Sequence, residues 1–203
     1  MNTSHPKNEK TLVLIKPDGI QRSLIGEVIK RYERTGLKLI AIKMLIPTSE
    51  MIETHYTLDP EWKLKTGLKN LQAYKDKGLT PPHDDPIKQS DMILEKLKNY
   101  MVSGPVIAMV WQGMHAVSIV RKITGGTEPL LSDVGTIRGD YVLDSYKTAD
   151  DDMRAIRNIV HASGTAKEAN DEIKHWFSDK EIISYNHIQD RILYDVNLDG
   201  ILD

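Results

Sequence analysis

The feature that most constrains the fold is the run VIAMVWQ at residues 106–112, which Ser103-Gly104-Pro105 precedes and Gly113 ends. A short, largely apolar run between chain-breaking residues predicts a strand buried on both faces. Residues 11–15, TLVLI, predict a second buried strand for the same reason, and residues 37–47 predict a third. A strand, a helix and a strand within residues 11–47 favour an α/β or α+β sandwich.

Helical patterns fill the spaces between these strands. Residues 22–35 carry apolar side chains at helical spacing, and Gly36 follows as a stop signal. Residues 48–56 begin with a capping box, in which Thr48 or Ser49 precedes Glu50 or Glu53. Further helices are predicted for residues 91–101 and 115–122 and from residue 166 onward. A chain of 203 residues is long enough for one such domain to bury its own core.

Composition narrows the classes of function. The formal net charge of -2 argues against a protein that binds nucleic acid by bulk electrostatics, although local arginines can still bind small anions. No apolar span reaches the roughly 18 residues of a membrane helix, and residues 1–10 resemble a short mobile leader rather than a signal peptide. The chain has no cysteine, which excludes disulfides and thiolate zinc sites and fits a cytoplasmic protein.

Three segments look like additions to a core domain at residues 11–185. Residues 57–91 are polar, with turn signals and only weak helical patterns, and residues 141–157 form a second polar segment. Residues 186–203 are interpreted as a charged C-terminal extension. The cluster His83-Asp84-Asp85 contains metal-binding residue types, but three adjacent side chains cannot easily point at one ion, so we expect a solvated loop.

The strongest candidate for chemistry is His161, in the segment RNIVHASG at residues 157–164. The chain has no cysteine and no Gly-rich phosphate loop of the Walker type, so a neutral imidazole is the best nucleophile at neutral pH. Asn158 and Ser163 can offer hydrogen bonds to it, and Glu172 lies on the helix that follows. Alone, the same histidine could simply cap the end of a strand.

Candidate anion-binding residues occur at the ends of the predicted elements. Lys16 stands where a buried strand meets the turn KPDG, and Arg121 and Arg138 stand beside glycine-rich loops. Thr127 lies in one of those loops, where backbone amides can approach an anion. Each cation alone is typical of a surface charge, but together they predict a phosphate clamp. Tyr56, at a helix end, could donate to an anion or be a half-buried aromatic.

Six ordered blocks of the chain resemble the nucleoside diphosphate kinase family. They are TLVLIKPDGIQRSLIGEVI at residues 11–29, HY at 55–56, SGPVIAMVW at 103–111, GGTEP at 125–129, GTIRGD at 135–140 and NIVHAS at 158–163. The resemblance implies an α+β, ferredoxin-like βαββαβ fold with a four-stranded antiparallel sheet and helices on one face. It also implies transfer of the γ-phosphoryl group of a nucleoside triphosphate to a nucleoside diphosphate through a phosphohistidine, which maintains nucleotide pools.

The resemblance assigns roles to individual residues. His161 matches the phosphorylated histidine, and Ser163 and Glu172 match the pair that orients it. The remaining matches bind nucleotide: they are Lys16 and Asn158 at the sugar hydroxyl and phosphates, Tyr56 beside the γ-phosphate, and Arg121, Thr127 and Arg138 as the phosphate-binding set. The family further implies Mg²⁺ held mainly by the nucleotide phosphates, and a homo-oligomer, either a tetramer or a hexamer.

The chain departs from the family pattern in three places. The insertion at 57–91 lies where the family places the residue that contacts the base. Counting back from the block at 103–111 puts Ile93 at this position, which we favour, whereas counting forward from Tyr56 puts Trp62 there. Gly164 stands where many relatives carry Asp, and the link between Arg138 and Asn158 is longer. Rival interpretations are a catalytically silent nucleotide-binding scaffold, which the retained catalytic residues argue against, and a regulator that binds nucleic acid.

Overall fold

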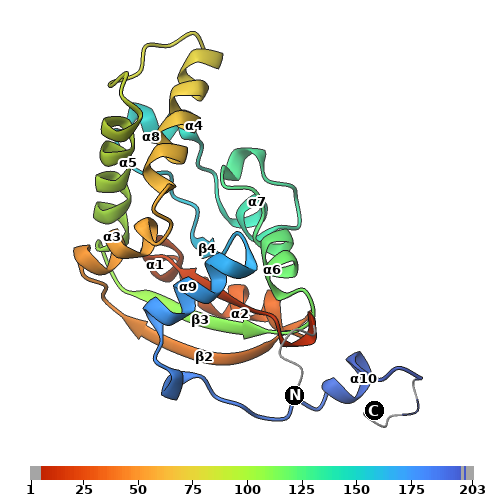
Figure 1. Cartoon of the computed structure of the whole chain (residues 1–203). Helices are drawn as coiled ribbons and strands as arrows, with labels where there is room; N and C mark the ends of the chain where they lie inside the picture. The colour runs from red at the N-terminus through yellow and green to blue at the C-terminus, as the bar shows by residue number, and fades with distance from the viewer. Residues whose placement is uncertain (1–5, 198, 200–203) are drawn as a thin grey trace.

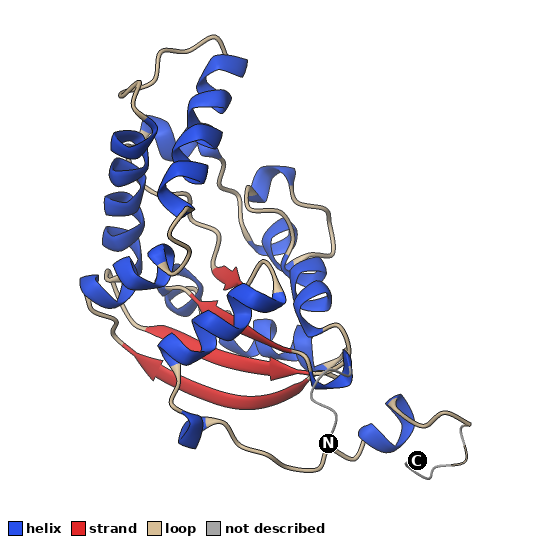
Figure 2. Ribbon diagram, viewed as in Figure 1, coloured by secondary structure: helices blue, strands red, loops and turns tan. Residues whose placement is uncertain are grey.

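The computed structural model describes residues 6–197 and residue 199, and Figures 1 and 2 show its elements. The four strands are β1 (Lys10–Ile15), β2 (Lys38–Leu45), β3 (Val106–Gln112) and β4 (Val160–Ala162). They form one sheet in the order β2-β3-β1-β4, and each hydrogen-bonded pair is antiparallel. This is the order of the ferredoxin-like βαββαβ fold, so the predicted fold class is confirmed.

Helices fill the connections between the strands. They are α1 (Pro17–Gln21), α2 (Ile25–Glu33), α3 (Ser49–Thr57), α4 (Trp62–Asp76), α5 (Pro86–Met101), α6 (Ala116–Thr124), α7 (Ile137–Tyr141), α8 (Tyr146–Asp151), α9 (Ala166–Trp176) and α10 (Asp190–Leu193), with 3-10 turns η1 (Pro6–Asn8), η2 (Pro129–Leu131) and η3 (Asp179–Glu181). The helix expected at 22–35 begins later, because Ser23 adopts a left-handed φ of 57°. Within the part of the chain that is described, no helix is long and apolar enough to cross a membrane.

Apolar side chains of β1 and β3 are buried on both faces of the sheet. Val13 and Trp111 pack in a cluster with α2 and α6, whereas Leu12 and Val110 pack in a second cluster with α3, α5 and α9. In Figure 1, α9 crosses the near face, and α2 lies behind the sheet. The implied arrangement with helices on one face only is therefore wrong. Its physical reason is that strands apolar at successive positions need cover on each side.

Residues 57–91 form most of a helical hairpin of α4 and α5, which stands away from the sheet (Figure 1). The two helices cross so closely that a Cβ atom on Gly67 would lie 1.8 Å from the carbonyl oxygen of Pro86. Asp85 caps α5, because its Oδ1 accepts hydrogen bonds from the backbone N–H groups of Ile87 at 2.7 Å and Lys88 at 3.1 Å. The polar composition of this segment thus reflects the exposed faces of two helices rather than a long loop.

Segments before β1 and after α9 are hydrogen-bonded to the sheet. The carbonyl oxygen of Glu9 accepts from the backbone N–H of Gly113 at 3.0 Å, so the described part of the expected leader is structured, while residues 1–5 lie outside the described residues. The segment after α9 follows the edge strand β2, where the backbone N–H of Ile183 donates to the carbonyl of Ile40 at 2.8 Å. Apolar side chains remain exposed along this edge, namely Ile42 and Met44 of β2 and Ile46 just after it.

The close contact between Gly67 and Pro86 yields a prediction about stability. We expect Gly67→Ala to lower the free energy of unfolding by about 1–3 kcal/mol, because the added methyl group meets rigid backbone atoms and must push α4 and α5 apart. Gly26→Ala in α2 is the matched control, since a Cβ there meets open space and alanine favours a helix. Urea denaturation measures both. Equal stability of the two variants would contradict the prediction.

Candidate active site

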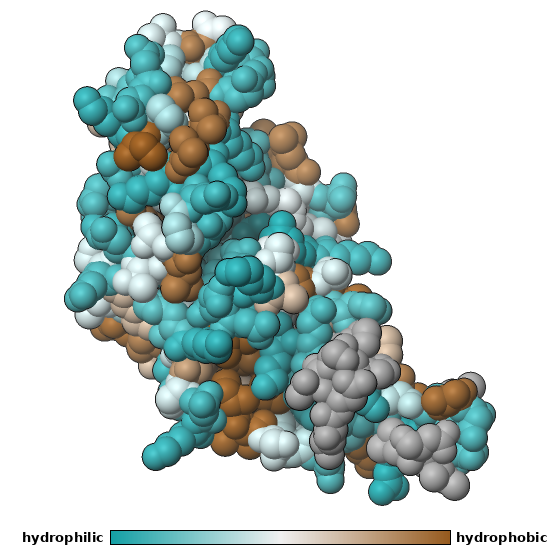
Figure 3. Space-filling model, viewed as in Figure 1, coloured by the Kyte–Doolittle hydropathy of each residue, from teal (hydrophilic) through white to brown (hydrophobic). Residues whose placement is uncertain are grey.

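A pocket of about 480 Å³ opens between the α4–α5 hairpin, the loops beside α6 and α7, and β4. The space-filling view in Figure 3 shows this face hollowed beneath the hairpin. Most of the residues predicted from the sequence line it, and they are Lys16, Tyr56, Ile93, Arg121, Thr127, Arg138, Asn158 and His161. The remaining two, Ser163 and Glu172, are buried behind His161. The fold thus brings together segments that are up to about 150 residues apart.

The backbone just before His161 is strained. Ile159 is fully buried and β-branched, yet its φ is 51°, a left-handed conformation that such residues rarely adopt. The strain is held from both sides: the backbone N–H of Val160 donates to the carbonyl of Asn158 at 2.6 Å, and that of Lys16 donates to the carbonyl of Ile159 at 2.8 Å. Such strain persists only where the surrounding structure enforces it. Here it sets the direction in which β4 presents His161.

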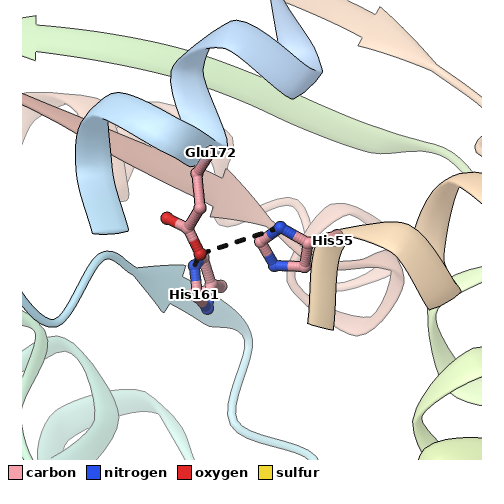
Figure 4. A group of neighbouring side chains, drawn as sticks. All are labelled: His55, His161 and Glu172. Atoms are coloured by element: carbon pink, nitrogen blue, oxygen red, sulfur yellow. Dashed lines mark hydrogen bonds and ion pairs between the residues drawn. The ribbon is translucent and has the colours of Figure 1, made fainter. Parts of the chain in front are cut away.

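His161 is oriented by a carboxylate from α9, as Figure 4 shows. Its Nε2 lies 2.8 Å from Oε1 of Glu172, and the hydroxyl of Ser163 donates to Oε2 of the same carboxylate at 2.5 Å. A buried carboxylate accepts hydrogen bonds, so Nε2 carries the proton and Nδ1 keeps its lone pair. The imidazole is therefore held in the tautomer that a nucleophile requires, with Nδ1 outside this hydrogen bond.

Glu172 keeps its negative charge despite burial. Burial by itself raises the pKa of this carboxyl, but the adjacent His161 ring, the hydrogen bonds from His161 and Ser163, and the nearby His55 lower it to about 2. The carboxylate is thus ionised at any physiological pH and accepts at both oxygens.

Arg138 is buried and makes all of its hydrogen bonds to backbone carbonyls. Nη1 donates to the carbonyls of Gly125 at 3.0 Å and Gly126 at 2.9 Å, Nη2 to that of Val160 at 2.6 Å, and Nε to that of Asn158 at 3.3 Å. Burial is the main cause that lowers the pKa of Arg138, to about 10, so the guanidinium remains charged at neutral pH. The guanidinium that the sequence suggested as a phosphate clamp also joins the loop after α6 to β4.

Lys16 and Asn158 form a second link across the inner end of the pocket. The ammonium of Lys16 donates to Oδ1 of Asn158 at 2.7 Å, and Nδ2 of Asn158 donates to the carbonyl of Thr127 at 3.0 Å. Burial, and secondarily the charge of Arg138, lowers the pKa of Lys16 to about 7, while Asp18 opposes the shift. The asparagine thus positions both the lysine and the loop that carries Thr127.

Gly164 adopts a local arrangement of its own. Its backbone N–H donates to Oε2 of Glu168 at 2.9 Å, and a Cβ atom at this position would lie 2.5 Å from that oxygen. Glu168 also lines the pocket. The departure from the family pattern at Gly164 therefore leaves room for the carboxylate of Glu168 at the pocket wall.

The outer half of the pocket contains both candidates for the base contact. Trp62 of α4 and Ile93 of α5 both line it, and the Trp62 ring centroid lies 5.7 Å from that of Tyr56. Sequence reasoning missed other lining residues, which include Asn70, Tyr74, Tyr146, Asp150 and Arg154. The spacing of Trp62, Thr66, Lys69, Asn70 and Ala73 along α4 is a helical pattern that could have identified this face.

His55 is a further residue of the site that sequence reasoning left without a role. Its side chain is buried, and its ring centroid lies 4.7 Å from that of His161. Its position beside Tyr56 in the block HY was the available signal. Together with His161 and Glu172 it offers three possible metal ligands within 4.8 Å of one another among the described residues. Two imidazoles and one carboxylate do not form the oxygen-rich set that Mg²⁺ prefers.

Comparisons with known proteins agree with this geometry. The family model described as nucleoside diphosphate kinase matches residues 9–74 and 86–182. The nucleoside diphosphate kinase of Pyrobaculum aerophilum is 44% identical over 179 residues, which cover 86% of this chain and 98% of that protein. The nucleoside diphosphate kinase of Borreliella burgdorferi is 36% identical over 177 residues, which cover 87% of this chain and 92% of that protein.

Solved structures show the same relationship. An NDP kinase from Pyrobaculum aerophilum superposes with a TM-score of 0.84 at 42% identity, covering 87% of this chain and all of that one. A transition-state mimic of the Borrelia burgdorferi nucleoside-diphosphate kinase, with bound vanadate and ADP, superposes with a TM-score of 0.73 at 35% identity, covering 90% and 94%. The chain is therefore an enzyme that belongs to the nucleoside diphosphate kinase family.

Proposed function

We propose that this protein transfers the γ-phosphoryl group of a nucleoside triphosphate to a nucleoside diphosphate through a phosphorylated His161. The observation that carries the proposal is the state of the His161 ring. Its Nε2 is bound to an ionised Glu172, while the ring lines a pocket that Lys16, Arg121 and Arg138 make positive. A fixed nucleophile beside concentrated positive charge fits attack on a phosphoryl group.

The proposed reaction has two half-reactions that share one site. In the first, the lone pair of Nδ1 on His161 attacks the γ-phosphorus, the bond to the β,γ-bridging oxygen breaks, and the nucleoside diphosphate leaves. In the second, a terminal phosphate oxygen of another diphosphate attacks the phosphohistidine, and the N–P bond breaks. Nε2 keeps its proton, which stays hydrogen-bonded to Glu172 throughout, so no proton transfer is needed. Alignment and charge neutralisation supply most of the catalysis.

The residues of the pocket divide this work. Lys16 and Arg121, with the buried charge of Arg138, offset the negative charge of the phosphates. Tyr56 stays protonated, since burial raises its pKa, and so acts as a neutral donor. Thr127 lies in the loop that Asn158 holds. We propose that Mg²⁺ enters on the nucleotide phosphates, where it would neutralise charge.

The first prediction of this proposal concerns the site of phosphorylation. We expect His161→Ala to fold normally and to accept no phosphate from radiolabelled ATP, because among the described residues no other histidine lines the pocket beside its cations. His83→Ala, in the exposed turn before α5, is the control and should label like the wild type. Acid-labile phosphate on the protein is the measured quantity. Stoichiometric labelling of the His161 variant would reject the assignment.

The second prediction concerns Glu172. Glu172→Gln removes the charge that holds Nε2–H, so phosphorylation of His161 should slow by about tenfold to a hundredfold, equivalent to roughly 1.4–2.7 kcal/mol, with little change in nucleotide affinity. Asp171→Asn on the same helix is the control, because Asp171 forms its ion pair with Lys167 near the surface. Single-turnover kinetics separate rate from affinity. If both variants slowed equally, an orienting role for Glu172 would be untenable.

The third prediction concerns the base. The proposed base contacts, Trp62 and Ile93, offer an aromatic face and an apolar surface, and stacking accepts any base. Purine and pyrimidine diphosphates should therefore have kcat/KM values within about a thousandfold, roughly 4 kcal/mol. Trp62→Ala should raise KM for every nucleotide by about tenfold, with a smaller effect for Ile93→Ala. A strong preference for one base that is lost when Asn70 or Asp150 is replaced would contradict this tolerance.

We also propose that the protein is a cytoplasmic homo-oligomer, a tetramer or a hexamer. The apolar side chains that the edge strand exposes, Ile42 and Met44 among them, support an interface between copies. Light scattering should therefore give a mass several times 23.0 kDa, and a stable monomer would end this part of the proposal. The lack of cysteine fits a reducing compartment, which cell fractionation can test.

A further inference from the structure

Behind His161 and Glu172 lies a buried pair that the proposed reaction does not use. The indole N–H of Trp176 in α9 lies 3.2 Å from Nδ1 of His55 in α3. The same Nδ1 lies 3.7 Å from Oε1 of Glu172, the oxygen that holds His161 (Figure 4). His55 is therefore placed to compete with His161 for one carboxylate oxygen, if its Nδ1 carried a proton.

The indole decides which nitrogen of His55 carries the proton. An indole N–H can only donate, so Nδ1 of His55 must accept and cannot itself bear hydrogen. A neutral imidazole then has its proton on Nε2. In this tautomer His55 offers no hydrogen to Glu172, and the carboxylate accepts only from His161 and Ser163. His55 and Glu172 are thus close to each other but form neither an ion pair nor a hydrogen bond.

The surroundings of His55 also oppose its protonation. The titratable groups that face it are His161 on β4, Glu172 and His175 on α9, Lys16 after β1 and the neighbouring Tyr56. Burial is the largest influence and lowers the pKa of His55 to about 3; His161, His175 and Lys16 act in the same direction, whereas Glu172 opposes them. His175 is itself engaged, with Nε2 2.8 Å from the carbonyl of Met51.

We propose that Trp176 and His55 are positioning residues, in which the indole holds His55 in its neutral, Nε2-protonated form so that Glu172 stays directed at His161. This inference rests on the proposed phosphorylation of His161. In this state the Nδ1 lone pair of His55 accepts the indole hydrogen bond and is not available to a metal ion.

The first experiment observes the tautomer directly and needs no activity. Histidine labelled with ¹⁵N in the wild-type protein should give His55 a pyridine-type Nδ1 signal and a pyrrole-type Nε2 signal from pH 5.5 to 8. Trp176→Phe removes the donor, so the neutral ring can change tautomer, and a pyrrole-type Nδ1 signal should appear. A wild-type His55 that is protonated at Nδ1 in this range overturns the proposal, whatever the variants do.

The second experiment measures the consequence for His161. Burial still keeps His55 neutral in Trp176→Phe, but the neutral ring can now carry its proton on Nδ1 and donate to the Glu172 oxygen that holds His161. Phosphorylation of His161 in Trp176→Phe should then be about tenfold slower than in the wild type, both at pH 5.5 and at pH 8. The ratio of the two rates at each pH cancels the pH effects that both proteins share.

Two further variants make the result specific. Trp111→Phe is the matched control, because its indole nitrogen is also buried but has no hydrogen-bond partner among the described residues, so its phosphorylation rate should match that of the wild type. The double variant Trp176→Phe/His55→Leu has no N–H at this position to donate to Glu172 and should recover the wild-type rate. A wild-type rate for Trp176→Phe, or no recovery in the double variant, overturns the proposal. If the wild-type protein itself accepted no phosphate from ATP, that result would instead reject the proposed function.

Discussion

The buried guanidinium of Arg138 is the interaction on which the rest of the site depends. It lies among four backbone carbonyls, from Gly125, Gly126, Asn158 and Val160, which belong to segments more than thirty residues apart. A charge at this depth requires several acceptors to compensate for lost hydration, and the loops must converge to supply them. The same requirement that closes the fold therefore also places positive charge at the inner end of the pocket.

The hydrogen bonds of Arg138 lead directly to the strained backbone before His161. The carbonyls of Asn158 and Val160 flank Ile159, whose left-handed backbone aims β4 at the pocket. On the far side of the sheet edge, α9 supplies Glu172 to the ring of His161. Helices α6 and α7 carry Arg121 and Arg138, while β4 and α9 carry the nucleophile and its partner. Precise orientation is thus assigned to the stiff parts of the molecule.

Much of this arrangement could be predicted from the sequence, because it depends on local patterns. The buried strands follow from apolar runs, and the resemblance of six blocks, not periodicity, supplied the sheet topology, which the structure confirms. What could not be predicted depends on contacts between distant residues. Most of the α4–α5 hairpin looked like a polar insertion with weak helical patterns because its exposed faces are polar, and its packing depends on the absence of a side chain at Gly67. The partnership of His55 with Trp176 joins residues 121 positions apart, so no spacing rule reveals it.

The burial of Lys16 has a thermodynamic consequence for ligand binding. With a pKa of about 7, about half of these side chains are neutral in the ligand-free protein at neutral pH. A phosphate placed beside the amine favours the ammonium form, so the proposed entry of a nucleotide takes up part of a proton from the solvent. The heat of binding then depends on the ionisation enthalpy of the buffer, and affinity declines as the pH rises above 7. In this way, occupancy of the pocket is coupled to the acidity of its surroundings.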